Sequence, residues 1–303
     1  MILPLLAFVK SERRSARVRS LLRLAPPTGS PRLAAAAIVV MALLVGVGAA
    51  QPVIEEWDER PERVDAQVFF VLDTSRSMLA SAGPGKPTRW DRAAASAREL
   101  REALGQVPVG IASMTDRVLP HVFPTSNARS FESVLRYSIG IDRPASDEAG
   151  DARATDLNAT TAFADGNYFR GAQRRLLVVF TDAESKRIDT GELTGAFSGG
   201  LIDTILVRFW AEGERVYGPD GVEEAYVPDQ NSAAAAEGYA QAVKGETFDE
   251  REFAAAIESA RSKLGSGTSV TYIKTADIQP LGPFVLLAGL LPLGFLLWRR
   301  NVV

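Results

Sequence analysis

Apolar and polar residues come in blocks along this chain, and two blocks are apolar throughout. Residues 33–50 and 281–298 contain no charged side chain. A helix of that length rises ~27 Å, close to the ~30 Å hydrocarbon thickness of a bilayer. Neither block has a polar face, and Pro283 and Pro292 would damage a helix in water but are tolerated in a membrane. The pattern therefore predicts two transmembrane helices.

Basic residues flank both apolar blocks on their outer sides. Residues 1–32 carry seven Lys and Arg and one acid, and Arg299 and Arg300 follow the second block. Because basic flanks stay on the cytoplasmic side, we expect a cytoplasmic N-terminal segment (1–32), a cytoplasmic tail (299–303) and an extracytoplasmic middle. A cleaved signal peptide is the alternative for the first block, since small residues in VGVGAAQ suit a cleavage site. The apolar start, MILPLLAFV, is too short to span and is expected to be an interfacial or degenerate segment.

Between the two blocks, short apolar runs alternate with segments of helical periodicity. The runs are typical of strands buried on both faces of a parallel sheet. They cover residues 66–72, 109–114, 176–180 and 204–210, and residues 118–123 are expected to pair antiparallel with the second run. Residues 90–105 and 249–265 have apolar positions at helical spacing. The alternation predicts an α/β fold with a doubly wound, mostly parallel sheet flanked by helices, in a domain over 66–275 preceded by a linker, 51–65.

Composition removes several classes of function. The chain has no cysteine and one histidine, His121, which excludes disulfides, thiolate chemistry and zinc sites with two or three histidines. His121 lies in an edge-strand context, VLPHVFP, where a plain strand residue is favoured over a catalytic one. Residues 51–280 hold 36 acids and 25 bases, a net charge of −11, so nucleic acid is not expected as a partner.

Hydroxyl and carboxylate residues follow two of the predicted strands and open a third loop. DTSRSM follows the first predicted strand, and TDAE follows the strand LLVVF. ATDL lies before LLVVF in the chain. Ligands bind beyond the carboxyl ends of such strands. The candidate metal ligands are Asp73, Ser75, Ser77, Thr155 and Asp182. Hard oxygens with few full charges suit Mg²⁺ or a similar divalent cation such as Mn²⁺ or Ca²⁺.

Each of these residues also has an ordinary structural explanation. Ser75 or Ser77 could cap the next helix, Thr155 could cap another, and Asp182 could be a turn residue. Their joint occurrence after the right strands, in the right order, favours the metal site.

The motifs DTSRSM, ATDL and FTDAE resemble the metal-ion-dependent adhesion site of von Willebrand factor A domains. The resemblance covers about residues 66–264. It implies that Ser75, Ser77 and Thr155 ligate the ion directly, and that Asp73 and Asp182 bind directly or through water. Arg76 stands where a glycine is common and Ala183 where TDG is usual, so the resemblance leaves the turn at Ala183 in question.

The layout as a whole is similar to bacterial Bat-type (aerotolerance-related) membrane proteins. These have a basic cytoplasmic segment, a membrane helix, an A domain and a closing membrane helix. The similarity implies possible partners among other A-domain membrane proteins and a MoxR-type AAA+ ATPase.

The expected function is a membrane-anchored module that binds a divalent cation and recruits a protein partner. A partner Asp or Glu would fill the open coordination position, in cell-envelope assembly or stress-related complexes. Three loops, residues 81–89, 141–151 and 211–232, would set specificity. One alternative is a structural exported domain without a functional metal site. A metal-dependent hydrolase is the other, but the sequence lacks a Gly-rich phosphate cradle and an evident general base apart from Glu184, so we do not expect an enzyme.

Overall fold

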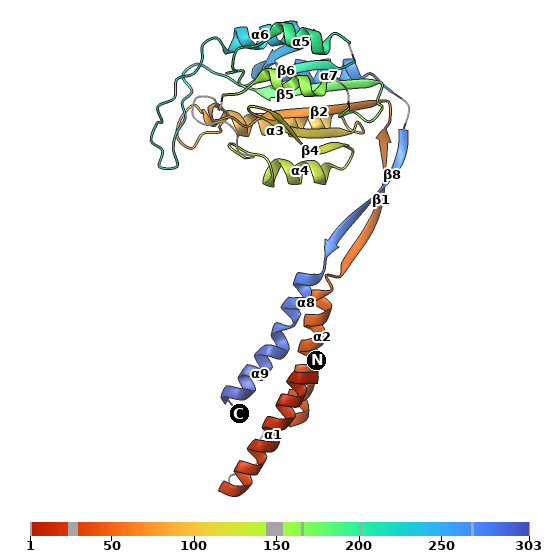
Figure 1. Ribbon diagram of the computed structural model, residues 1–303, viewed down its shortest axis with the longest axis vertical. Helices are drawn as coiled ribbons and strands as arrows, with labels where there is room; N and C mark the ends of the chain where they lie inside the picture. The colour runs from red at the N-terminus through yellow and green to blue at the C-terminus, as the bar shows by residue number, and fades with distance from the viewer. Residues whose placement is uncertain are drawn as a thin grey trace. The chain divides into compact units, whose positions relative to one another are not determined.

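The computed structural model describes residues 2–23, 30–143, 154–164, 167–199, 201–267 and 270–302. The chain divides into two compact units (Figure 1). One unit is Glu59–Ile273, and the other combines Met1–Asp58 with Lys274–Val303.

The larger unit is built on a six-stranded sheet (Figure 1). Its strand order is β4-β3-β2-β5-β6-β7, and all neighbours are parallel except β3 and β4. The strands are β2 (Ala66–Asp73), β3 (Val109–Met114), β4 (Val118–Thr125), β5 (Arg174–Thr181), β6 (Asp203–Arg208) and β7 (Glu246–Asp249). The predicted α/β fold is therefore confirmed, including the antiparallel β3–β4 pair. Strand β7 is short and half-polar, so the apolar pattern did not indicate it.

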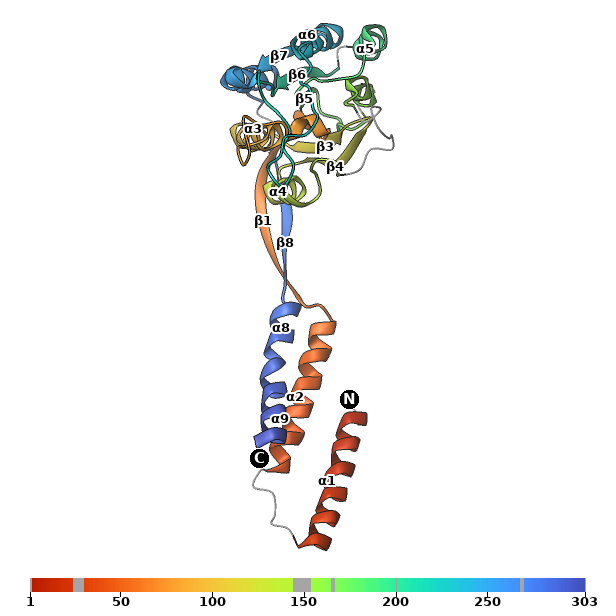
Figure 2. The ribbon, with the colours of Figure 1, turned by 90° about the vertical axis from the view of Figure 1, so that its left-hand side faces the viewer.

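Helices cover both faces of this sheet (Figure 2). Val68, Phe70 and Leu72 of β2 pack on one face, together with α3 (Arg89–Ala103), α4 (Ala128–Tyr137) and α7 (Phe253–Leu264). Phe69 and Val71 point to the other face, which is covered by η3 (Leu157–Phe163), α5 (Thr190–Phe197) and α6 (Ser232–Val243). Alternate strand residues thus feed two cores, which is why the runs are apolar without alternation.

Local capping signals fix the helix starts. Thr88 and Asp91 form a capping box at α3, and Asp249 and Glu252 form the box expected from their spacing, at the short turn η4 (Glu250–Glu252) that leads into α7. Gly265 ends α7 with a positive φ of 56°, as its position after the periodic segment indicates.

The strand order reverses between β2 and β5. The chain runs from β2 through β3 to β4 on one side, and from β5 through β6 to β7 on the other. Leu72 at the end of β2 is level with Phe180 at the end of β5. This reversal is a topological switch point, the place where open α/β sheets bind ligands.

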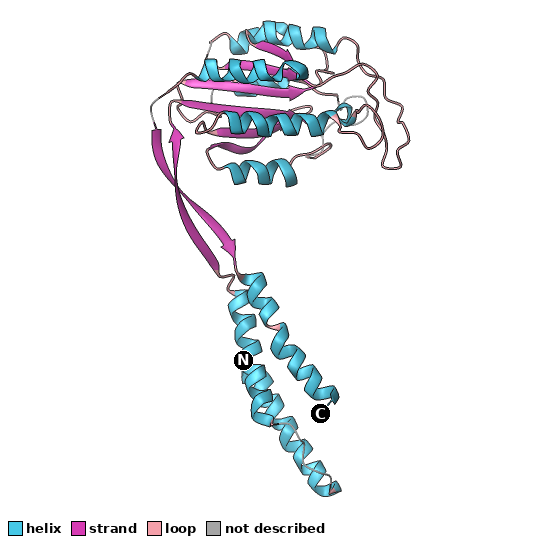
Figure 3. Ribbon diagram, turned by 180° about the vertical axis from the view of Figure 1, so that it is seen from behind, coloured by secondary structure: helices cyan, strands magenta, loops and turns pink. Residues whose placement is uncertain are grey.

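In the part of the chain that the structure describes, the other unit consists mainly of four helices. These are α1 (Ile2–Leu22), α2 (Pro31–Ala49), α8 (Gly282–Ala288) and α9 (Leu290–Val302). Strands β1 (Val53–Arg63) and β8 (Val270–Pro280) form a separate two-stranded sheet (Figure 3), so residues 51–65, which the sequence suggests as a linker, contain a strand. Residues 2–9 of the apolar start MILPLLAFV belong to the longer helix α1.

Helix α2 runs antiparallel to α8 and α9. At one end Leu281 N donates to Pro52 O at 2.8 Å, and at the other Arg299 Nη1 donates to Ser30 O at 3.0 Å. A Cβ on Gly48 would lie 2.7 Å from Leu286 Cδ2, so this glycine lets α2 and α8 approach closely. Pro283 sits in the first turn of α8, where its missing N–H costs little.

Two helical spans in this unit are long and apolar enough to cross a membrane. They are Pro31–Ala49 and Gly282–Arg299. Large apolar side chains on them are exposed, including Leu33 (60%), Leu287 (64%) and Trp298 (55%). A core helix of a water-soluble domain would bury such residues, so their exposure fits a lipid environment.

Candidate functional site

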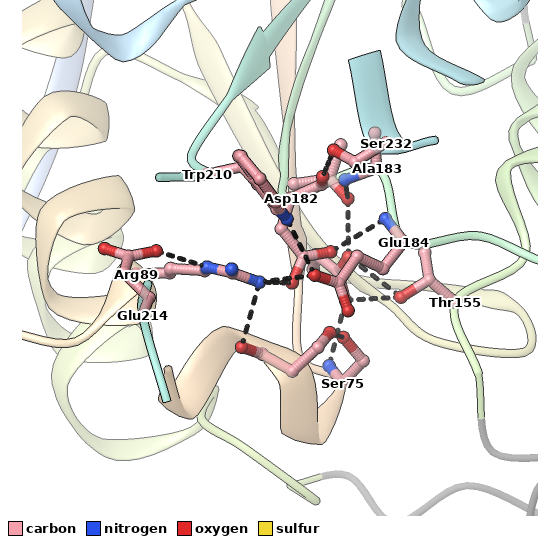
Figure 4. A network of polar contacts seen from close by, with 12 residues as sticks. Ser75, Arg89, Thr155, Asp182, Ala183, Glu184, Trp210, Glu214 and Ser232 are labelled. Atoms are coloured by element: carbon pink, nitrogen blue, oxygen red, sulfur yellow. Dashed lines mark hydrogen bonds and ion pairs between the residues drawn. The ribbon is translucent and has the colours of Figure 1, made fainter. Parts of the chain in front are cut away.

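The five predicted ligands lie at or near the carboxyl ends of β2 and β5, at the switch point of the sheet, and Figure 4 shows three of them, Ser75, Thr155 and Asp182. Asp73 is the last residue of β2, and Ser75 and Ser77 follow in the turn that leads through η1 (Arg76–Leu79). Asp182 follows β5 directly. Thr155 lies beside the residues after β5, because Lys186 N donates to Thr155 O at 2.7 Å and Thr155 bridges to Ser185.

Asp73 is the centre of the cluster. Its Oδ1 accepts from Ser75 N at 2.9 Å and from Thr155 Oγ1 at 3.0 Å, and its Oδ2 accepts from Thr155 Oγ1 at 2.9 Å and from Thr181 Oγ1 at 2.5 Å. The side chain is fully buried. Burial, and after it the nearby negative charge of Asp182, raises the pKa of Asp73 to about 7.

The two serines lie beside each other. Ser75 Oγ and Ser77 Oγ are 2.9 Å apart, and Ser75 is almost fully buried. Ser75 stands at the N-cap of η1, yet its side chain makes no capping hydrogen bond within the described chain. Likewise the cap of η3 is Asp156, whose side chain accepts from Asn158 N at 3.0 Å, and not Thr155. Simple capping therefore does not account for Ser75 or Thr155.

Asp182 combines a turn role with an ion pair that the sequence did not indicate. Its Oδ1 accepts from Glu184 N at 3.0 Å, which is the turn geometry of the ordinary explanation. Its Oδ2 accepts from Arg89 Nη1 at 2.9 Å, and both side chains are fully buried. The close-up therefore places a fixed guanidinium against one of the two predicted carboxylates (Figure 4).

Arg89 is held by further groups. Its Nη1 lies 2.9 Å from Glu184 Oε1 and 2.9 Å from Tyr226 Oη, and its Nε donates to Glu214 Oε2 at 2.7 Å. Burial alone would lower the pKa of Arg89, but the surrounding acids, Asp182 first, outweigh it and raise that pKa. Trp210 Nε1 donates to Glu184 Oε1 at 3.0 Å. One local signal of this network is present in the sequence. Arg89 stands in the first turn of α3, where the helix dipole disfavours a cation.

The long loop after β6 folds onto the neighbouring loop. Ser81 and Arg215 exchange backbone hydrogen bonds of 2.8 and 3.0 Å, and Tyr226 Oη donates to Glu184 Oε1 at 2.6 Å. Two of the three loops expected to set specificity, 81–89 and 211–232, are thus joined beside the site. Most of the third, residues 144–151, lies outside the described residues.

The two departures from the family motif have distinct consequences. Arg76 is half exposed and forms salt bridges with Glu224 at 2.8 Å and Asp142 at 3.5 Å. These two acids therefore compensate its positive charge. Ala183 adopts a left-handed φ of 58°, the conformation that a glycine at this turn would adopt without strain.

The donor set fits a small divalent cation. Asp73 is a fully buried carboxylate that the described residues supply with hydroxyl and amide donors but with no cationic side chain within hydrogen-bond distance. Two carboxylates and neighbouring hydroxyls are hard oxygen donors, as Mg²⁺ prefers. No group of three or more Asp, Glu or His side chains that could hold a metal is found among the described residues. That finding is compatible with a site whose other donors are hydroxyls.

A comparison with known families decides the identity of this domain. The family model of the von Willebrand factor type A domain matches residues 68–184. Those residues form a von Willebrand factor type A domain. Among curated proteins, nothing matches this chain.

Solved structures share the fold of this A domain. BatB from Bacteroides thetaiotaomicron has a TM-score of 0.51 at 18% identity, over 66% of this chain and 100% of that one. An aerotolerance-related membrane protein from Bacteroides fragilis has a TM-score of 0.50 at 19% identity, over 66% and 98%. At these identities the likeness extends to the fold. The predicted resemblance to von Willebrand factor A domains is therefore confirmed, and Bat-type proteins are among the structures that share this fold.

Proposed function

We propose that this protein is a membrane-anchored A domain that binds a divalent cation and uses it to recruit a protein partner. The cation, Mg²⁺ or Mn²⁺ or Ca²⁺, would be held by Asp73, Ser75, Ser77, Thr155 and Asp182. The buried Asp73 carboxylate carries this proposal, because a buried charge needs a compensating charge and a cation at this position would provide it.

The residues of the site would have different roles. Asp73 supplies negative charge and is oriented by Thr155, Thr181 and the Ser75 amide. Ser75, Ser77 and Thr155 offer neutral oxygens that leave most of the ion's charge uncompensated. When bound, the cation supplies an electron-poor centre that attracts a carboxylate. An Asp or Glu of the partner would fill the remaining position, and the joined loops beside the site would select its surroundings.

The antiparallel arrangement of α2 with α8 and α9 supports a topology with the A domain outside the cytoplasm. Arg32 at the start of α2 and Arg299 at the end of α9 belong to the same end of the pair, because α2 and α9 are antiparallel and Arg299 reaches Ser30. The chain continues into the A domain from the opposite end, after Ala50 and before Leu281. Basic residues favour the cytoplasmic side.

A hydrolase remains the weaker candidate. Two glutamates beside the site, the partly buried Glu184 and the buried Glu214, both accept from Arg89, and Glu214 also pairs with Arg92 at 2.7 Å. Burial raises the pKa of Glu184, as does the charge of Asp182. An acid held by a fixed cation is a poor general base, so partner recruitment is preferred.

Metal-dependent stability tests the cation site. In thermal melts of the full chain in detergent, Mg²⁺ at ~100 times its Kd should stabilise the fold by ~2.7 kcal/mol, and a chelator should remove the effect. Asp73→Ala and Asp182→Ala should abolish the response to Mg²⁺. Glu132→Gln is the matched control, because Glu132 is an exposed acid that pairs with Arg98 away from the site. Equal responses of wild type and Asp73→Ala would remove the cation site and leave a structural domain.

Crosslinking tests the recruitment. Membranes that contain the wild-type chain should yield a crosslinked partner in the presence of Mg²⁺. The yield should fall to background with chelator or with Asp73→Ala, and Glu132→Gln should behave as wild type. A partner captured equally with and without the metal would contradict recruitment through the cation.

A further inference from the structure

Arg89 is a fully buried cation inside the acidic part of the metal site. Its exposed fraction is zero, and it contacts the carboxylates of Asp182, Glu184 and Glu214 at 2.7–2.9 Å (Figure 4). The guanidinium lies 5.9 Å from the ring centres of both Trp210 and Tyr226. Contacts from several directions fix its position, so it is a permanent charge of the site.

The three acids depend on Arg89 to different degrees. Glu214 has a second cation, Arg92, whose Nη2 lies 2.7 Å from Glu214 Oε1. Glu184 also accepts hydrogen bonds from Tyr226 and Trp210. Asp182 has Arg89 as its one cationic partner among the residues that the structure describes. Arg89 is thus the counter-ion of a predicted metal ligand.

We infer that Arg89 is a resident counter-cation that competes with the metal ion for Asp182 and sets the affinity of the site. This inference rests on the proposed function. In the absence of metal, Arg89 compensates Asp182 and keeps the loop after β5 in place. When a divalent cation arrives, it meets a carboxylate that is already partly neutralised and a positive charge nearby. Both effects weaken its binding.

Weaker binding of the metal by this chain would favour recruitment of the partner's carboxylate. A site with two unpaired carboxylates would satisfy much of the charge of a divalent cation by itself. With Arg89 in place, more of that charge remains for a carboxylate from outside. Arg89 therefore favours a metal that is held jointly by this chain and its partner.

The opposite role for Arg89 is that of a positioning residue. The guanidinium would then orient Asp182 for the metal, and its removal would weaken metal binding. Charge and geometry can be separated because lysine keeps the positive charge and loses the planar fork of arginine.

Metal binding by the full chain in detergent, measured with Mn²⁺ by electron paramagnetic resonance and calorimetry, tests the inference. Arg89→Met should bind Mn²⁺ at least ~10-fold more tightly than wild type, because a nearby positive charge is removed. Its thermal midpoint without metal should fall, since buried acids lose their counter-ion. Arg89→Lys should keep an affinity close to that of wild type.

Arg92→Met is the matched control. Arg92 lies on the same helix and pairs with Glu214 and Glu250, and it is partly exposed. This variant should change the Mn²⁺ affinity much less than Arg89→Met. If Arg89→Met does not fold, Arg89→Met combined with Glu214→Gln removes one of the three acids that contact Arg89, and Arg89→Lys discriminates by itself.

The outcomes separate the two proposals. Unchanged or weaker Mn²⁺ binding in Arg89→Met, or weaker binding in Arg89→Lys, would overturn competition and leave the proposed function intact. No Mn²⁺ binding in wild type together with tight binding in Arg89→Met would support Arg89 as the occupant of the site and overturn metal-dependent recruitment. No binding in any variant would overturn both.

Discussion

At the scale of a single residue, Ala183 shows how the turn after β5 departs from the TDG pattern. Its φ of 58° lies in the left-handed region, which costs a non-glycine residue roughly 1–2 kcal/mol. Ala183 is also fully buried, so its methyl group contributes packing that a glycine would lack. The two terms oppose each other, and the sequence departure from TDG is thus tolerated.

Substitution of Ala183 should reveal this balance. Ala183→Gly should change the free energy of unfolding by less than ~1 kcal/mol, because relief of φ strain offsets the lost methyl and the greater freedom of the unfolded chain. Ala183→Val should destabilise by ~2 kcal/mol or more, because a β-branched residue disfavours positive φ and overpacks the site. Denaturant titration of the full chain measures both. A large loss in Ala183→Gly would show that packing of the methyl dominates.

At the scale of elements, the contact between β2 and β3 depends on a glycine opposite an aromatic ring. Gly110 of β3 is paired with Phe69 of β2, and a Cβ on Gly110 would lie 2.8 Å from Phe69 Cζ. The Phe69 ring is fully buried against other rings and cannot move aside easily. Its aromatic neighbours within 6.2 Å are Phe123, Phe163, Tyr168 and Phe169.

Two glycine-to-alanine changes should therefore have opposite signs. Gly110→Ala should destabilise the A domain by ~1–3 kcal/mol through overpacking. Gly195→Ala, in helix α5, should stabilise it by ~0.5–1 kcal/mol, because alanine favours the helix and its Cβ would have no described atom within 4 Å. Thermal midpoints of the two variants provide the measurement. Equal effects would mean that the Phe69 core repacks freely.

At the scale of the whole molecule, charge and apolar length together favour one orientation in the membrane. The N-terminal 32 residues and the C-terminal five carry the excess of basic residues, whereas residues 51–280 carry a net charge of −11. Since basic segments stay in the cytoplasm, both ends are expected inside and the A domain outside.

Because the chain has no cysteine, single-cysteine labelling can test this topology. Glu132→Cys, on exposed helix α4, should react with a membrane-impermeant maleimide in spheroplasts with an intact inner membrane. Ser11→Cys, in the basic segment, should react only after the membrane is permeabilised. The reversed pattern would place the A domain in the cytoplasm and exclude an extracytoplasmic partner.

Much of the architecture follows from local pattern. The run 109–114 forms β3 with those bounds, residues 90–105 form α3 within two residues, and Asp249 with Glu252 caps as its spacing requires. These features depend on neighbours in the chain, so periodicity and capping chemistry suffice to predict them. Strand β7 was missed because four half-polar residues carry no such pattern.

The sequence by itself determined which strand ends and loops carry Asp73, Ser75, Ser77, Thr155 and Asp182. Motif spacing and apolar runs are local features, so they can be recognised without the tertiary structure. Tertiary structure alone decided that Arg89 pairs with Asp182 and that Glu214 and Tyr226 close around it. Those partners lie 93 to 137 residues from Arg89 along the chain. Burial and ion pairing across such separations exist only once the sheet brings β2, β5 and β6 together, so no local pattern encodes them.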